Sequence, residues 1–313
     1  MLSIRVDLPG PFDLAGSLEY LRRNGDDLID RWDGATLVRM LPVGERCRPL
    51  AMTTVGDLDT PRFLVETPVA LGETIDESAL SSSVAAQFVT AHDALADLAA
   101  KDAVIDSLVR RHRGIGVLLQ PHLLHALIRS ISAQQVNLAW ATVTRARLVE
   151  LVGTRYPVGS HAAYAIDPDR LAGTSVGALR ALQFTTAKAE YIITVARAIV
   201  DGVLDIPTLA QAEDAEVIAR LTSLRGIGRW SAEWFLVRSL GRARVVGGDL
   251  GVRKAVGFAY NHQEVPSEAE TRRLTAQWGP AAPVAQQLVL EAHAARGRND
   301  EAPVTRSASA GSR

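Results

Sequence analysis

The stretch 221–254 constrains the fold of this 313-residue chain more than any other segment. It begins Leu-Thr-Ser-Leu-Arg-Gly-Ile-Gly-Arg-Trp-Ser-Ala-Glu-Trp and ends Val-Val-Gly-Gly-Asp-Leu-Gly-Val-Arg-Lys. The pattern predicts a helix that ends near Leu224, a hairpin through Gly226 and Gly228, and a second helix over about 229–240. The Gly-Gly pair then leads to Asp249 at the start of a third helix.

The hairpin has the ingredients of a phosphate-binding site. Gly226 and Gly228 permit positive φ and a close approach of the backbone, and the next helix begins with unpaired N–H groups at its positive end. Arg225 and Arg229 flank the turn and would add positive charge. An ordinary αα-hairpin, whose glycines only cap and turn the chain, explains the same residues.

Three side chains after the hairpin are candidates for a pocket. Trp230 and Trp234 are four residues apart, so they share one helix face, and aromatic faces can hold a flipped base. A tryptophan pair buried in a core is the alternative. Asp249 suits a helix N-cap, and its position after Gly-Gly also lets it meet a ligand.

Two polar groups lie between apolar helical runs. In the segment 130–137, Gln134 and Gln135 either project into a groove or cover a helix junction with amide hydrogen bonds. His122 and His125 have no third metal ligand nearby, so we expect packing histidines and no metal. Neither a dinucleotide fingerprint nor a phosphate-binding lysine loop occurs, so no cofactor is expected.

Composition and charge exclude several classes of protein. The single cysteine, Cys47, excludes an internal disulfide and any site built on several thiolates. Without an apolar run of 18 residues or an export signal, we expect a cytoplasmic protein with no membrane span. The net charge of −1 divides into −8 for residues 1–100 and +7 for residues 101–313. A polyanion that binds only the second part explains this division, and so does chance asymmetry on solvated faces.

The rest of the chain predicts a mainly α protein with a small α+β domain at its start. Within residues 1–80, the segments 2–8, 35–41, 48–55 and 62–69 have sequence patterns typical of β-strands, and a helix is predicted from about residue 13. Residues 81–295 are predicted to be helical, at 82–99, 102–111, 121–133, 134–152, 160–166, 175–182, 186–201, 213–224, 229–240, 249–259, 267–277 and 281–295. Residues 296–313, rich in Ser, Ala, Gly and charge, are predicted to form a disordered tail.

Together these stretches resemble the helix-hairpin-helix (HhH-GPD) DNA glycosylase superfamily, in its DNA-3-methyladenine glycosylase II branch. The hairpin is followed by Gly-Gly-Asp at the family spacing, and Ile131-Ser-Ala-Gln-Gln-Val-Asn is similar to the segment that probes the minor groove. Phe12-Asp-Leu, Trp32-Asp-Gly and Leu41-Pro-Val-Gly look like the N-terminal domain of that branch. The resemblance implies a helical bundle in two subdomains, one near 121–240 and one from the helices before and after it, with Asp249 at the seam.

The resemblance also implies a monofunctional base-excision-repair enzyme. It would hydrolyse the N-glycosidic bond of alkylated purines such as 3-methyladenine and 7-methylguanine in double-stranded DNA, leave an abasic site, and act as a monomer. The implied roles are catalysis by Asp249 in the loop 245–250, a base pocket of Trp230, Trp234 and Leu250, phosphate binding by Arg225, Gly226, Gly228 and Arg229 in the hairpin 221–234, and minor-groove probing by Gln134 and Gln135.

Departures from the family pattern leave two alternatives open. Members that also cut the strand carry a Schiff-base lysine two residues after the second hairpin glycine, where this chain has Trp230, so no lyase activity is expected. Leu250 and Leu290 replace aromatic residues of some members, which favours ethenoadenine or deaminated purines as an alternative substrate class. A non-catalytic DNA-binding module with the same hairpin is the second alternative.

Overall fold

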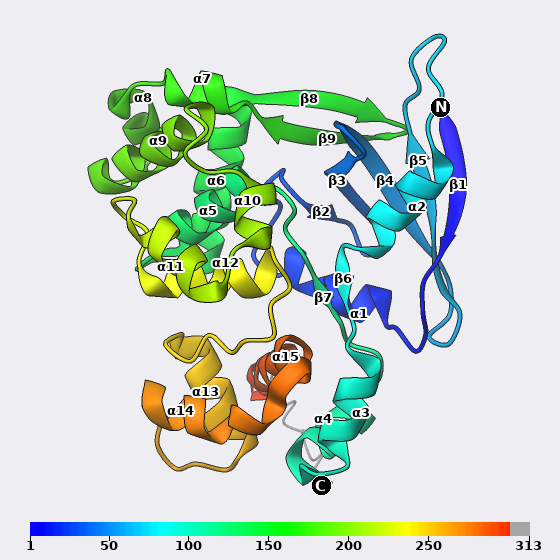
Figure 1. Cartoon of the computed structure of the whole chain (residues 1–313), viewed down its shortest axis with the longest axis vertical. Coiled ribbons are helices and arrows are strands. Elements are labelled where there is room, and N and C mark those ends of the chain that lie inside the picture. The colour runs from blue at the N-terminus through cyan, green and yellow to red at the C-terminus, as the bar shows by residue number, and fades with distance from the viewer. Residues whose placement is uncertain (301–313) are drawn as a thin grey trace, which may run out of the picture.

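The computed structural model describes residues 1–300, and its first part is an antiparallel sheet (Figure 1). The strand order is β1-β5-β4-β3-β2, formed by β1 (Leu2–Asp7), β2 (Arg31–Trp32), β3 (Thr36–Val43), β4 (Arg46–Gly56) and β5 (Pro61–Thr67). The helix α1 (Leu14–Leu18), the 3₁₀ turn η1 (Glu19–Leu21) and the helix α2 (Glu77–Ala85) accompany it. The alternation of the first strands therefore predicted the α+β domain correctly.

The domain boundary differs from the expected one at residue 80. That residue lies inside α2, where Leu80 and Val84 are fully buried against the sheet residues Leu37 and Phe63. Asp76, four residues earlier, caps the helix by accepting hydrogen bonds from backbone N–H groups. The first domain consequently includes the whole of α2.

The rest of the described chain is mainly helical, as the periodicity predicted. Its helices are α3 (His92–Ala99), α4 (Ala103–Arg111), α5 (Leu123–Ala133), α6 (Leu138–Val152), α7 (Pro168–Ala172), α8 (Val176–Ala181), α9 (Thr186–Val200), α10 (Ile206–Gln211), α11 (Asp214–Thr222), α12 (Arg229–Arg238), α13 (Leu250–Ala259), α14 (Glu268–Leu274), the 3₁₀ helix η2 (Ala276–Ala281) and α15 (Ala282–Asp300). Two short antiparallel pairs join them, β6 (Phe88–Val89) with β7 (Val117–Leu118) and β8 (Gly153–Val158) with β9 (His161–Ile166).

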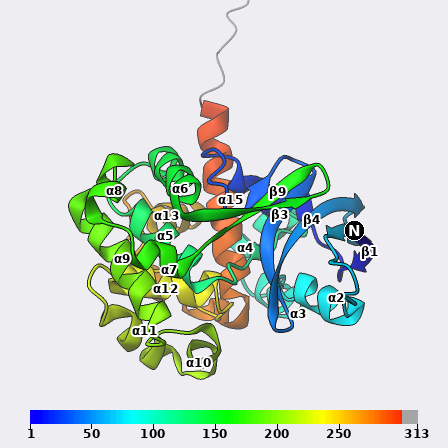
Figure 2. The ribbon, with the colours of Figure 1, turned by 90° about the horizontal axis from the view of Figure 1, so that it is seen from above.

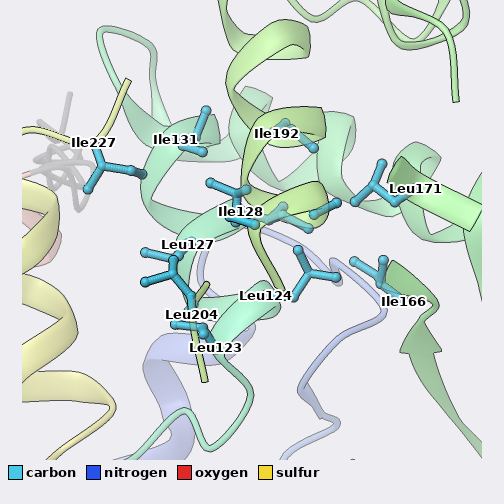
Figure 3. Close-up of a cluster of buried hydrophobic side chains, with 14 of the residues drawn as sticks. Leu123, Leu124, Leu127, Ile128, Ile131, Ile166, Leu171, Ile192, Leu204 and Ile227 are labelled. Atoms are coloured by element: carbon cyan, nitrogen blue, oxygen red, sulfur yellow. The ribbon is translucent and has the colours of Figure 1, made fainter. Parts of the chain in front are cut away.

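The helices enclose two separate hydrophobic cores. The first is built from α5 to α12, and Figure 3 shows Leu127, Ile128 and Ile192 at its centre. The second joins α3 and α4 to α13, η2 and α15, so helices from before and after the first group share it. Two helical subdomains of this composition are what the resemblance implied. In Figure 2, α15 runs along the middle of the molecule.

The hairpin β8–β9 corrects one sequence-based expectation, because a turn residue and the strand His161–Ile166 occupy the expected helix 160–166. Figure 1 shows the hairpin extending from the helices to the N-terminal sheet. Val158 and Ala163 pack against Val38, Met40 and Ala51 on the sheet face opposite α2. The alanine-rich sequence favours a helix in isolation, but burial against the sheet outweighs that local preference.

The C-terminal helix is longer than expected. α15 continues through Asp300, so the first five residues of the expected tail, 296–300, are helical, and the remainder lies outside the described residues. Among residues 1–300, no helix has both the length and the apolar character needed to cross a membrane.

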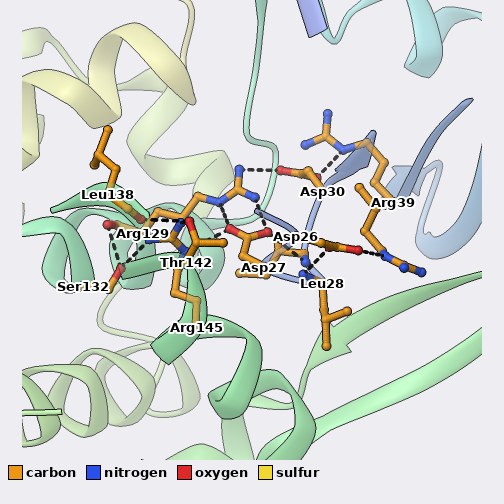
Figure 4. Close-up of polar contacts among 12 residues, drawn as sticks. Asp26, Asp27, Leu28, Asp30, Arg39, Arg129, Ser132, Leu138, Thr142 and Arg145 are labelled. Atoms are coloured by element: carbon orange, nitrogen blue, oxygen red, sulfur yellow. Dashed lines mark hydrogen bonds and ion pairs between the residues drawn. The ribbon is translucent and has the colours of Figure 1, made fainter. Parts of the chain in front are cut away.

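A buried ion network connects the N-terminal domain to the first helical core (Figure 4). Arg129 pairs with Asp27 at 2.9 Å and with Asp30 at 2.7 Å, and Arg145 pairs with Asp27 at 2.9 Å. Arg39 of β3 pairs with Asp30 at 2.8 Å. Burial alone would raise the pKa of Asp27, but the two arginines outweigh it and hold that pKa at about 2.

Candidate active site

Asp249 is held by three N–H donors. It is the N-cap of α13, where its Oδ1 accepts a hydrogen bond from the backbone N–H of Val252 at 2.8 Å. Its Oδ2 accepts from Nε1 of Trp230 at 2.7 Å and from Nε1 of Trp234 at 3.1 Å. Because all three partners donate, the arrangement suits an ionised carboxylate and fixes its orientation. The predicted cap is confirmed, and the same carboxylate lines a pocket.

The pocket beside Asp249 has a volume of about 370 Å³ and lies between the two helical cores. Trp230 and Trp234 line it, as the sequence predicted, and so does Leu290 of α15. The remaining lining residues are Tyr20, Gln120, Ala126, Arg129, Ser130, Ala133, Leu138, Ser231, Phe235, Arg238, Ser239 and Gly251. Pockets of this size, largely apolar with a few polar groups, are typical of small-molecule sites.

Leu250 does not line the pocket, contrary to the expectation from the sequence. Its side chain is 55% exposed, and Gly251 borders the pocket instead. Asp249 and Gly251, the residues on either side of Leu250, both border the pocket, so its place in the sequence does not decide whether it lines the pocket. The presence of leucine instead of an aromatic residue at position 250 therefore says less about the pocket than the resemblance to the family implied.

Tyr20 and Arg238 are pocket residues that the sequence analysis missed. Arg238 is four residues after Trp234 and eight after Trp230, so helical spacing could have placed it on the same face of α12. Its guanidinium lies 5.5 Å from the ring centroid of Trp234 and 5.4 Å from that of Tyr20. Tyr20 comes from η1 of the N-terminal domain, and no local sequence pattern predicts this long-range contact. The N-terminal domain thus contributes a side chain to the pocket.

The two hairpin glycines have different roles. Gly226 has φ +91°, and an added Cβ would lie 2.1 Å from the ring of Tyr191, so only glycine fits. Gly228 has φ −92°, a value that any residue adopts, so it does not use the positive φ that glycine permits. Its Cα faces open space, and it caps α12 without a side-chain hydrogen bond. Ile227 between them is buried in the first core and anchors the turn (Figure 3).

Arg225 and Arg229 flank the hairpin with exposed guanidinium groups. The Arg225 side chain is 75% exposed, pairs with Glu190 at 3.5 Å and lies 5.8 Å from the ring centroid of Tyr191. The Arg229 side chain is 62% exposed and pairs with Glu233 at 3.0 Å. Each guanidinium therefore lies beside one carboxylate, while most of the arginine side chain stays exposed at the surface.

Glu233 connects α12 to the segment that carries Asp249. This buried carboxylate pairs with Arg229, with Arg244 at 3.5 Å, and with Arg272 of α14 at 2.9 Å. An added Cβ at Gly247 would lie 2.8 Å from Cγ of Arg272. The Gly-Gly pair thus allows the loop to pack closely against α14. This packing fixes the path of the backbone that leads to Asp249.

Gln134 and Gln135 lie in different environments, the first bonded to the hairpin and the second exposed. Nε2 of Gln134 donates a hydrogen bond to the carbonyl oxygen of Gly226 at 2.9 Å, so this side chain joins the end of α5 to the hairpin. That contact matches the helix-junction alternative. Gln135 is exposed and has φ +55°. Asn137 then caps α6 by accepting from the N–H of Trp140.

The paired histidines pack against each other. The rings of His122 and His125 are 4.9 Å apart, and burial lowers the pKa of both. Within residues 1–300, no three side chains of His, Cys, Asp or Glu are grouped so as to hold a metal ion.

Comparisons with known proteins agree with this geometry. The model of the HhH-GPD superfamily base excision DNA repair proteins matches residues 128–281. A DNA-3-methyladenine glycosylase of Bacillus subtilis is 24% identical over 284 residues, 88% of this chain and 92% of the relative. A second B. subtilis protein, provisionally named DNA-3-methyladenine glycosylase, is 26% identical over 183 residues, 56% of this chain and 61% of its own length.

Two solved structures have the same fold over nearly the whole chain. The 3-methyladenine DNA-glycosylase from Archaeoglobus fulgidus superposes with a TM-score of 0.77 at 20% identity, covering 93% of this chain and 98% of that one. The 8-oxoguanine glycosylase/lyase of Clostridium acetobutylicum, solved with DNA, superposes with a TM-score of 0.69 at 16% identity, covering 93% of each chain. With its hairpin and its Asp249 pocket, the chain belongs to the HhH-GPD superfamily of base excision DNA repair proteins, in which its relatives are DNA-3-methyladenine glycosylases.

Proposed function

We propose that this chain is a monofunctional DNA glycosylase that hydrolyses the N-glycosidic bond of damaged purines and leaves an abasic site. The observation that carries the proposal is the carboxylate of Asp249, held by two indole N–H groups at the wall of a base-sized pocket. The names of the relatives support the coarser class, a DNA-3-methyladenine glycosylase. The alkylated purines 3-methyladenine and 7-methylguanine are the proposed substrates.

The chemistry follows from the position of the carboxylate. A damaged nucleotide rotates out of the stack, and its base enters between the pocket walls, where Trp230 and Trp234 offer aromatic contact. As the base leaves, the sugar gains oxocarbenium character, which the negative charge of Asp249 stabilises while water attacks C1′. An alkylated purine is a good leaving group because it already carries positive charge, so no strong general acid is required.

The lysines of the chain favour hydrolysis over strand cleavage. A lyase needs an amine that attacks C1′ and forms a Schiff base. The chain has three lysines, Lys101, Lys188 and Lys254, and none of them lines the pocket. Lys188 instead donates a hydrogen bond to the carbonyl oxygen of Ser132. Water is therefore the proposed nucleophile.

Double-stranded DNA is the proposed partner, bound by a monomer in the cytoplasm. Residues of a single chain complete the pocket. Beside it, the hairpin offers Gly228 with open space around it, a helix start without a side-chain cap and the exposed charges of Arg225 and Arg229. These groups suit a DNA phosphate.

Replacement of Asp249 by Asn tests the proposal. Asn is as good an N-cap as Asp, so α13 should persist while the negative charge is lost. We expect base release from duplexes carrying a single lesion to fall by at least about 100-fold with DNA affinity retained. Asp205→Asn is the matched control, because Asp205 caps α10 in the same way and lies outside the pocket.

The assay distinguishes the proposal from its alternatives. The lesions should include 7-methylguanine, hypoxanthine and ethenoadenine, with alkali used to reveal abasic sites. Release of ethenoadenine or hypoxanthine alone would favour the second substrate class. Binding of the duplexes with no release from any lesion would establish a non-catalytic module. Borohydride trapping of a covalent adduct would contradict hydrolysis without lyase chemistry.

A further inference from the structure

A buried carboxylate of α12 is shared by arginines from three places in the helical part of the chain. The side chain of Glu233 is 1% exposed. The arginines that pair with it are Arg229 in the first turn of α12, Arg244 in the loop between α12 and α13, and Arg272 of α14. Loss of the one anion from such a cluster leaves partly buried cations without a partner, which is costly. Glu233 is therefore a fixed point for all three segments.

Arg272 connects this carboxylate to the loop that leads to Asp249. Its Nη2 atom lies 2.9 Å from each carboxylate oxygen of Glu233, and its Nη1 atom donates to the carbonyl oxygen of Val245 at 3.5 Å. Its side-chain carbons lie against Gly247, where an added Cβ would meet Cγ at 2.8 Å. One guanidinium, fixed by Glu233, thus lies along the backbone just before Asp249.

The helix α12 therefore reaches Asp249 in two ways. Trp230 and Trp234 donate directly to its Oδ2 atom. Glu233, which lies between the two tryptophans in the sequence, acts instead on the loop backbone through Arg272. The indoles fix the carboxylate group, and the ion pair fixes the segment that carries it. Accurate placement of a reacting group depends on both.

Arg229 extends the connection to the hairpin. It reaches Glu233 through Nε at 3.0 Å, and its side chain, next to Gly228 in the chain, is 62% exposed. That bond uses one of the three guanidinium nitrogens, so the two terminal nitrogens can donate to a phosphate while Nε stays on the carboxylate. A phosphate at the hairpin and the loop before Asp249 would then be joined through one buried side chain.

We propose that Glu233 is a positioning residue for base release. Through Arg272 it holds the loop that carries Asp249, and through Arg229 it ties that loop to the phosphate-binding hairpin. The proposal rests on the proposed glycosylase function and names a further residue for that reaction. Glu233 does not line the pocket, so Asp249 remains the catalyst.

Glu233→Gln tests the proposal because it keeps the shape of the side chain and removes the charge. The substrate is a duplex with one lesion that the unaltered chain releases, mixed with increasing excesses of protein. The single-turnover rate constant at saturating protein should fall about 10-fold or more, because Asp249 loses its alignment. Affinity for the same duplex, measured by fluorescence anisotropy, should not fall, because Arg229 keeps its charge. A merely structural defect would raise the protein concentration needed for saturation and leave the saturated rate constant unchanged.

Glu268→Gln is the matched control, because Glu268 pairs with the same Arg272 at 2.8 Å but is 51% exposed. Exposed ion pairs contribute little, so the saturated rate constant should stay unchanged. Arg272→Lys is a second test from the other side of the pair. It keeps the charge but lacks the planar fork that contacts Glu233 and Val245 together, so it should also lower the rate constant.

An unchanged saturated rate constant in folded Glu233→Gln, or an equal loss in Glu268→Gln, would overturn the positioning role while leaving the glycosylase intact. If Glu233→Gln does not fold, Arg272→Lys decides in its place, and an unchanged rate constant in that variant would overturn the role. Absence of release by the unaltered chain from every lesion would instead remove the proposed function itself. An unfolding curve for each variant shows which proteins are folded.

Discussion

At the scale of single residues, the tryptophans of α12 contribute more than aromatic surface. Their indole N–H groups both reach Oδ2 of Asp249, while the cap hydrogen bond occupies Oδ1. A carboxylate fixed by donors of two elements cannot rotate without losing one of them. The side chains that wall the pocket thus also orient the group proposed to act on the sugar.

Trp230→Phe separates these two roles. It keeps an aromatic wall and removes the donor at 2.7 Å from Asp249. We expect the single-turnover rate of base release to fall about 10-fold, because one hydrogen bond to a charged acceptor is lost, with little change in DNA affinity. Trp234→Phe removes the longer bond and should have the smaller effect. Equal losses of affinity and rate would indicate that the indoles serve binding alone.

Local residues of the site were predictable from the sequence, and distant ones were not. Asp249 follows Gly-Gly and precedes a helix, and Trp230 and Trp234 share one helix face, so local rules placed all three. Leu250 was misplaced because its position next to Asp249 in the sequence does not fix the direction of its side chain, which is exposed. Tyr20 reaches the pocket only because the N-terminal domain packs against the helices. The spacing of residues around Tyr20 does not predict that packing.

At the scale of elements, the hairpin between α11 and α12 combines one strained position with one open position. Gly226 is fixed by its positive φ and by the ring of Tyr191, and Ile227 is anchored in the core. Gly228 has neither constraint. The turn is therefore rigid at its base and accessible at the start of the helix, which is the form that suits a phosphate.

Replacement of each hairpin glycine by alanine should affect a different property, stability for Gly226 and DNA affinity for Gly228. Gly226→Ala forces a Cβ into Tyr191 at a positive φ, and we expect a loss of about 2 kcal/mol or more in the free energy of unfolding, measured with urea. Gly228→Ala should change stability by less than about 0.5 kcal/mol. It should nevertheless weaken binding to duplex DNA, because the added methyl occupies the space into which a phosphate would come. Unchanged affinity for Gly228→Ala would argue against the phosphate role.

The misprediction of β9 is also an effect at this scale. The sequence His-Ala-Ala-Tyr-Ala-Ile has good helix formers and no clear alternation. Its partner surface, Val38 with Met40 and Ala51, is more than 100 residues earlier in the chain. Long helices such as α9 and α15 carry their own periodicity and were predicted well, whereas this strand depends on a surface that only the folded chain presents.

At the scale of the whole molecule, the buried ion network holds the domains in register. Asp27 and Asp30 belong to the N-terminal domain, and Arg129 and Arg145 to helices of the first core. Arg129 also lines the pocket. Removal of one member of such a network leaves a buried charge without a partner, which is more costly than loss of an exposed ion pair.

The pKa of Asp27 makes a pH-dependent contribution to stability. Its folded value of about 2 lies below the usual value of 3.8, so its contribution is present above about pH 4 and is lost as the pH falls toward 2. The difference corresponds to about 2 kcal/mol. Asp27→Asn should lower stability by about 3 kcal/mol at pH 7, and the gap to the unaltered protein should narrow between pH 4 and 2. Urea unfolding at several pH values measures the stability difference between the two proteins. A difference that stays constant between pH 4 and 2 would contradict the lowered pKa of Asp27.

The β8–β9 hairpin has a consequence for how a lesion is found. Together with the ion network it fastens the N-terminal sheet to the helices, so Tyr20 and α12 stand opposite each other before any DNA arrives. The conformational entropy of bringing these walls together is lost during folding and not during binding. The duplex is then the partner that must deform, and the stiffness of the base steps around a lesion, rather than motion of the protein, would set how readily that base is captured.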